Sequence, residues 1–204
     1  MSVGTIVSET PRTPFGLPTG SVRGIISVLI CAFFWVILLW PQEHPVTVVL
    51  AHFFLLGLVL MAFASAPHIE KVEGIHLIPW LLRVIFVGGS AAVVAIAWYR
   101  DPILLQQRLT PNGNEVATWW VPFLACTFGG FALGQFLRFI MGRDNHIFRT
   151  IRAWLSVVGM VMLAVEIALV IAFASTSDKS TLEFLHIWDC FELAIVSAYF
   201  GTRA

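Results

Sequence analysis

Five ionisable residues of this sequence fall inside strongly apolar stretches, where their chemistry would be unusual. They are His52, Glu166, His186, Asp189 and Glu192. An ionisable group within the hydrocarbon of a membrane is costly, so each one is a hypothesis for a functional site. No lysine or arginine lies at the same depth in these stretches. Some of the carboxyl groups must therefore carry a proton, bind a cation or pair with a histidine.

The spacing of these residues predicts that they share one layer of a membrane. His52 and His186 lie about 8 to 9 Å inside the ends of their apolar stretches, at roughly 1.5 Å per residue. Glu166 and Asp189 lie about one turn deeper, and Glu192 lies near the middle of its stretch. Because residues three apart are neighbours on a helix surface, His186 and Asp189 are expected on one face.

Four interpretations of this polar layer remain open. We rank a hydrogen-bonded network within the protein first and a route for protons or cations second, since chains of carboxyl groups and histidines recur in such routes. A b-type haem held between His52 and His186 ranks behind them. So does a metal site formed by these histidines and Asp189, with Cys126 or Cys190 as a further ligand. No cofactor is predicted.

The composition shows what kind of element must position these residues. Apolar residues make up 58% of the 204 residues and charged residues only 12%, whereas about a quarter of an average soluble domain is charged. This composition excludes a water-soluble globular domain. Twelve basic and twelve acidic residues give zero formal charge, so no nucleic-acid partner is expected.

Six stretches are long and apolar enough to cross a membrane, which takes about 20 residues each. They cover residues 24–40, 46–66, 79–99, 119–141, 154–174 and 181–200. The fold class predicted is all-α, a polytopic membrane protein with six transmembrane helices. We expect a proline-rich cytoplasmic arm over residues 1–23, a bundle over 24–204, and loops over 100–118 and 142–153.

Basic residues predict the orientation of these helices. With the amino terminus in the cytoplasm, the loops and tails on that side hold seven basic residues and those on the other side hold three. The seven are Arg12, Arg23, Lys71, Arg143, Arg149, Arg152 and Arg203. The three are Arg100, Arg108 and Lys179. The positive-inside rule therefore places both termini in the cytoplasm and the protein in the cytoplasmic (inner) membrane.

Glycines predict where the helices pack. Gly88 and Gly89 lie together in the third stretch, and Gly129, Gly130 and Gly134 lie in the fourth. Small residues let the backbones of membrane helices approach closely, which supplies packing energy where the hydrophobic effect does not.

Three arginines in the predicted loop 142–153, namely Arg143, Arg149 and Arg152, are expected to set the topology. They are also candidates for contact with anionic lipid headgroups.

The sequence contains no motif that indicates catalysis. It has no Gly-x-Ser-x-Gly elbow, phosphate-binding loop or His-Glu-x-x-His helix. We therefore expect a non-catalytic membrane subunit or scaffold, in contact with lipid and with other membrane subunits or further copies of itself. The alternative is a small proton or cation channel or transporter that uses the buried carboxyl groups and histidines. A membrane redox subunit with haem or metal ranks below both.

Overall fold

The computed structural model describes residues 21–40, 48–64, 77–142, 145–173 and 179–203. These residues form seven helices and no strand, which confirms the all-α prediction. The helices are α1 (Ser21–Leu39), α2 (Leu50–Ala64), α3 (Leu77–Arg100), α4 (Pro102–Leu109), α5 (Gly113–Met141), α6 (His146–Phe173) and α7 (Lys179–Gly201). The predicted arm over residues 1–23 lies outside the described residues up to position 20.

Four of the described helices are long and apolar enough to cross a membrane, rather than the six that we expected. They are Val22–Leu39, Gly113–Met141, His146–Val170 and Glu183–Gly201. The apolar parts of α2 and α3 are shorter, Leu50–Met61 and Val84–Arg100. The predicted stretch 46–66 begins and ends outside the described residues.

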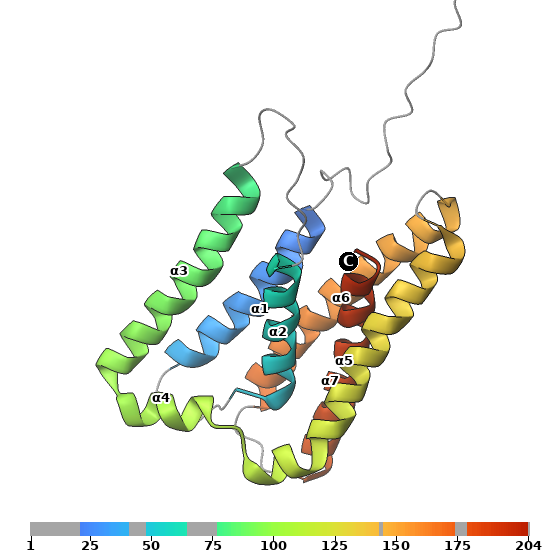
Figure 1. The fold of residues 1–204 in the computed structure, drawn as a ribbon. Helices are drawn as coiled ribbons and strands as arrows, with labels where there is room; N and C mark the ends of the chain where they lie inside the picture. The colour runs from blue at the N-terminus through green and yellow to red at the C-terminus, as the bar shows by residue number, and fades with distance from the viewer. Residues whose placement is uncertain (1–20, 41–47, 65–76, 143–144, 174–178, 204) are drawn as a thin grey trace, which may run out of the picture.

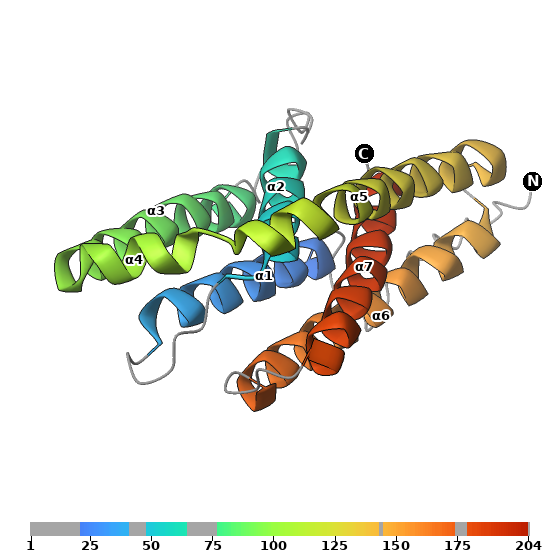
Figure 2. The ribbon, with the colours of Figure 1, turned by 90° about the horizontal axis from the view of Figure 1, so that it is seen from below.

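The long helices run alternately up and down between two ends of the molecule (Figure 1). At one end, here called the α4 end, α4 lies beside the last turns of α1 and α3 and the first turns of α2 and α5. The other end, here called the C-terminal end, holds the start of α1 and the end of α7. Helix α7 packs against α2, α5 and α6, whereas α3 lies at the edge and packs against α1 and α4 (Figure 2).

Two segments that we expected as loops are largely helical. Within residues 100–118, Asp101 accepts hydrogen bonds from the amides of Ile103 and Leu104 at 3.0 Å, and Pro102 occupies the first turn of α4. An aspartate cap followed by proline is a helix-start signal that the loop prediction overlooked. Within residues 142–153, the backbone of Gly142 has a φ of 72° and ends α5, and α6 begins at His146.

Helices α5 and α7 approach each other at glycines. A Cβ atom on Gly130 would overlap the backbone of Ala194, and one on Gly134 would overlap the backbone of Ala198. On α7, a Cβ atom on Gly201 would overlap the backbone of Phe131. Backbone contact of this kind is the close approach that small residues permit in membrane helices.

The other predicted packing glycines have different surroundings. Gly89 leaves room for the Trp35 ring of α1, which would lie 2.7 Å from a Cβ atom there. The same indole donates a hydrogen bond to the Ser90 hydroxyl at 3.0 Å, which links α1 to α3. No atom of the described chain lies within 4 Å of a Cβ position on Gly88 or Gly129. These two glycines are exposed on the outer faces of α3 and α5.

Candidate functional site

Three acidic side chains are buried in the contact between α6 and α7, and we call them the acid cluster. Glu166 of α6 is 3% exposed, and Asp189 and Glu192 of α7 are 4% and 1% exposed. Their positions follow from the spacing of three residues on α7, which turns both acids toward neighbouring helices. The structure thus brings together three of the five ionisable residues that the sequence analysis selected.

The members of the acid cluster act on one another electrostatically. The carboxyl groups of Glu166 and Glu192 interact directly, and the charge of Asp189 acts on both. Among the described residues, Glu166 Oε2 and both carboxyl oxygens of Glu192 have no hydrogen-bond partner. Buried polar atoms are normally satisfied, so these oxygen atoms have open positions at which they can accept protons.

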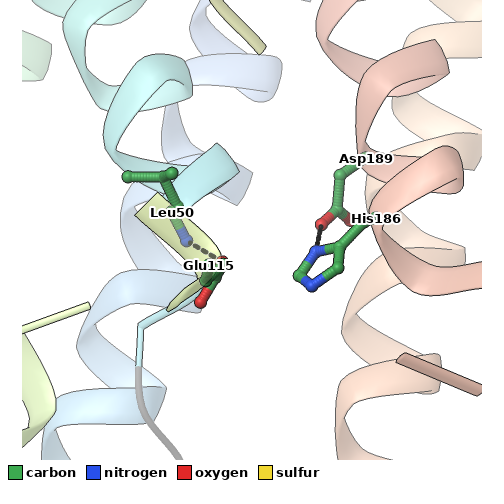
Figure 3. A network of polar contacts seen from close by, with 4 residues as sticks. All are labelled: Leu50, Glu115, His186 and Asp189. Atoms are coloured by element: carbon green, nitrogen blue, oxygen red, sulfur yellow. Dashed lines mark hydrogen bonds and ion pairs between the residues drawn. The ribbon is translucent and has the colours of Figure 1, made fainter. Parts of the chain in front are cut away.

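His186 joins the acid cluster to the α4 end. Its Nδ1 atom lies 3.8 Å from Asp189 Oδ2, a separation longer than a hydrogen bond (Figure 3). The imidazole packs against the rings of Trp119 and Phe123 of α5, with centroids 4.9 and 6.1 Å away. The side chain of His186 is 16% exposed and that of Asp189 is 5% exposed. His186 is therefore the more accessible partner.

Burial increases along α7 from Glu183 to Glu192, on a stripe that turns by about 60° around the helix with each step of three residues. Glu183 is exposed, His186 is partly buried, and Asp189 and Glu192 are buried. The three-residue spacing keeps each group within about one turn of the next. A series of acidic and imidazole groups therefore leads from the α4 end to the buried Glu166–Glu192 contact.

His52 has a separate environment, formed by α1. Its Nε2 atom donates a hydrogen bond to the carbonyl oxygen of Ile30 at 2.9 Å, and its ring packs edge-on against Phe33 at 4.8 Å. Because a carbonyl oxygen only accepts, this bond assigns the proton to Nε2. His52 is thus hydrogen-bonded to α1 rather than directed at the acid cluster.

The residues considered as metal or haem ligands lie in different contacts between helices and not in one site. Cys126 of α5 and Cys190 of α7 lie next to each other, and both are free thiols. Within the described residues, no set of three histidines, cysteines or acids is arranged to hold a metal ion. The Nε2 atom of His52, one of the two proposed haem ligands, is engaged with the backbone of α1.

Sequence reasoning missed Arg108, a fully embedded charge at the α4 end. Its Nη1 atom donates hydrogen bonds to the carbonyl oxygens of Ile37 at 3.0 Å and Leu38 at 2.9 Å, and Nη2 donates to that of Trp40 at 2.8 Å. Arg108 is only 2% exposed, and burial lowers the pKa of its guanidinium. Arginine remains charged in proteins, so this cation caps the negative end of α1.

Sequence reasoning also missed Glu115, which caps the start of α2 as Arg108 caps the end of α1. Its Oε1 atom accepts a hydrogen bond at 3.0 Å from the amide of Leu50, the first residue of α2 (Figure 3). A carboxylate at a helix start satisfies a free amide and complements the helix dipole. The charge of Glu115 also acts on Asp189, which places it near the entrance of the acid cluster.

Two of the three arginines expected to contact lipid, Arg149 and Arg152, lie about one turn apart on α6 and act on each other as like charges. Arg149 is exposed on the first turn of α6, and Arg152 lies over the Phe148 ring with its Cζ atom 6.0 Å from the centroid. Arg143 lies outside the described residues.

Comparison with known proteins gave no match: no family model fits the chain, and no curated protein or solved structure is significantly similar to it. Three buried carboxyl groups, with a histidine beside them and one end near the surface, form an arrangement suited to holding and passing protons.

Proposed function

We propose that the protein is a multi-pass membrane protein in which the acid cluster relays protons across part of the membrane. The observation that carries the proposal is the burial of Glu166, Asp189 and Glu192 against one another. Their spare oxygen atoms can exchange protons, and His186 can deliver them from the α4 end. A small cation such as sodium is the alternative cargo, because carboxylate oxygens also suit such ions.

Flux measurements on reconstituted protein test this proposal. Purified protein in liposomes should collapse an imposed proton gradient, and Glu166→Gln and Asp189→Asn should abolish this flux while the fold survives. An imposed sodium gradient run in parallel distinguishes the two cargoes. Wild-type flux no higher than that of empty liposomes would contradict the proposal for the isolated chain.

A second proposed function is that of a subunit or scaffold in a larger membrane assembly. It is favoured by the outward face of α3, where Gly88, Ala91, Ala92 and Ala95 are all exposed. Lipid tails gain little from such a face, whereas another helix can pack closely on it. Native mass spectrometry after extraction in a gentle detergent tests this role. A bound partner or a defined oligomer is expected, and a stable monomer that conducts on its own would favour the relay alone.

The topology that we propose has six membrane crossings with both termini in the cytoplasm, in the cytoplasmic membrane. The alternation of the long helices between two ends supports it, because α2 and α3 run in the directions that two further crossings require (Figure 1). Arginines are also more frequent near the C-terminal end than near the α4 end. Reporter fusions after Asn112 and at Ala204 should locate to opposite sides of the membrane.

A further inference from the structure

Helices α5 and α7 run in the same direction with their turns in register. A Cβ atom on Gly130 would overlap the backbone of Ala194. Four residues further along both helices, which is about one turn, a Cβ atom on Gly134 would overlap the backbone of Ala198. One face of α5 therefore meets one face of α7 at successive turns, and Figure 2 shows the two helices side by side.

Two cysteines occupy the turn that precedes these contacts, and we call Cys126 and Cys190 the thiol pair. On α5, Cys126 lies four residues before Gly130, and on α7, Cys190 lies four residues before Ala194. Residues four apart share a helix face, so both cysteines belong to the faces that meet. A side-chain hydrogen bond joins the two thiols. A disulfide requires two backbones in close approach, with Cα atoms roughly 4.4 to 6.8 Å apart, and the register of α5 and α7 brings the thiol pair together in this way.

The thiol pair is accessible, but from within the membrane. Cys126 and Cys190 are free thiols and both are partly exposed, whereas Cys31 of α1 is only 3% exposed. Helices α5 and α7 are each long and apolar enough to cross a membrane. Cys190 lies seven residues inside the apolar segment Glu183–Gly201, at a depth of about 10 Å. A reagent that reaches the thiol pair must therefore dissolve in hydrocarbon.

The geometry points to the thiol pair as a redox-active site, which a lipid hydroperoxide oxidises to a disulfide between Cys126 and Cys190. One sulfur attacks the outer oxygen of the peroxide and the O–O bond breaks. A sulfenic acid forms on that sulfur, and the lipid alcohol leaves with the thiol hydrogen. The second sulfur then attacks the first, the S–S bond forms, and water leaves with the second thiol hydrogen. The two sulfurs are oxidised and the peroxide is reduced, so no further reactant is needed.

The disulfide would fasten α5 to α7, the helix that carries Asp189 and Glu192. Oxidation of the thiol pair would therefore restrict movement between these two helices, and a dithiol reductant would release them by thiol–disulfide exchange. This inference does not depend on proton transfer by the acid cluster, because it concerns only the register of α5 and α7 and the chemistry of the two thiols.

Treatment of the reconstituted chain with cumene hydroperoxide, an apolar peroxide, tests this site. The intact mass should fall by two hydrogen atoms, and digestion without reductant should yield one linked pair of peptides from α5 and α7. After denaturation, only one of the three cysteines, Cys31, should then react with N-ethylmaleimide. Dithiothreitol should reverse the change and restore all three reactive thiols.

Serine variants assign the linked sulfurs. Cys126→Ser and Cys190→Ser should each abolish the link, and Cys31→Ser is the matched control that should retain it. Thermal unfolding shows whether each variant is folded, and the mass and alkylation of the wild-type chain decide the question even if a variant is not. Three reactive thiols after peroxide treatment would overturn the proposal. So would oxygen added to a sulfur without a link, or a link to Cys31 or to a second copy of the chain.

Discussion

The guanidinium of Arg108 and the carboxyl groups of the acid cluster are all buried ionisable groups. They differ in how many of their polar atoms have a hydrogen-bond partner. The terminal nitrogens of Arg108 donate to three carbonyl oxygens at 3.0 Å or less. In the acid cluster, both oxygens of Glu192 and one of Glu166 have no partner among the described residues. Arg108 Nε also lacks a partner among the described residues, so the difference lies in the terminal nitrogens. The comparison suggests that a buried charge with most of its bonds made stabilises the fold, whereas one with open bonding positions is available for chemistry.

The positions of the two regions support this difference. Arg108 closes the last turn of α1 and, through its backbone carbonyl, accepts a hydrogen bond from the amide of Val48 at 3.1 Å. It thereby joins α4 to both ends of the connection between α1 and α2. The acid cluster joins only α6 to α7, and those helices also pack together through apolar side chains such as Leu163 and Leu193. Loss of one carboxyl charge should therefore cost less stability than loss of Arg108.

The largest effect is expected from Arg108→Met. This change keeps much of the side-chain volume but removes three hydrogen bonds from a charged donor, and it should lower the free energy of unfolding by about 3 kcal/mol or more. Thermal unfolding in detergent measures the loss. Arg108→Lys keeps the charge without the fork of donors, so it should recover only part of the stability. Wild-type stability in Arg108→Met would break the comparison.

A smaller effect is expected from Glu115→Ala. The amide of Leu50 loses its acceptor and the start of α2 loses a negative charge, at a cost of about 1 to 2 kcal/mol. Glu115→Gln keeps an acceptor oxygen and should restore most of the difference. Thermal unfolding of the two variants side by side measures the share due to the hydrogen bond. Equal losses would mean that the charge matters and the bond does not.

The smallest change in stability is expected from Glu192→Gln. An amide keeps the hydrogen-bonding capacity and the shape of a carboxylic acid, so the free energy of unfolding should change by less than about 1 kcal/mol. Proton flux into liposomes should nevertheless fall to the background level, because an amide does not exchange the transported proton. A large loss of stability with flux retained would assign the acid cluster a structural role and reverse the comparison.

Part of the candidate site could be predicted from the sequence. The spacing of His186 and Asp189 predicted a shared helix face, and the depth of Glu166 predicted its layer. The contact between Glu166 and Glu192 could not be predicted, because it depends on how α6 and α7 are rotated about their axes. The bond from His52 to Ile30 could not be predicted either, since a backbone carbonyl leaves no signal in residue type.

The sequence by itself determined that the described chain is helical, and where ionisable groups interrupt its apolar segments. Those properties depend on residue type and on neighbours within a few turns. Only the tertiary structure decided which buried polar groups have hydrogen-bond partners and which lack them. The partners of Arg108 are carbonyl oxygens up to 71 residues away, and the Arg23 guanidinium of α1 lies 5.6 Å from the centroid of the Phe200 ring of α7. Such contacts depend on packing between helices, which local pattern does not specify.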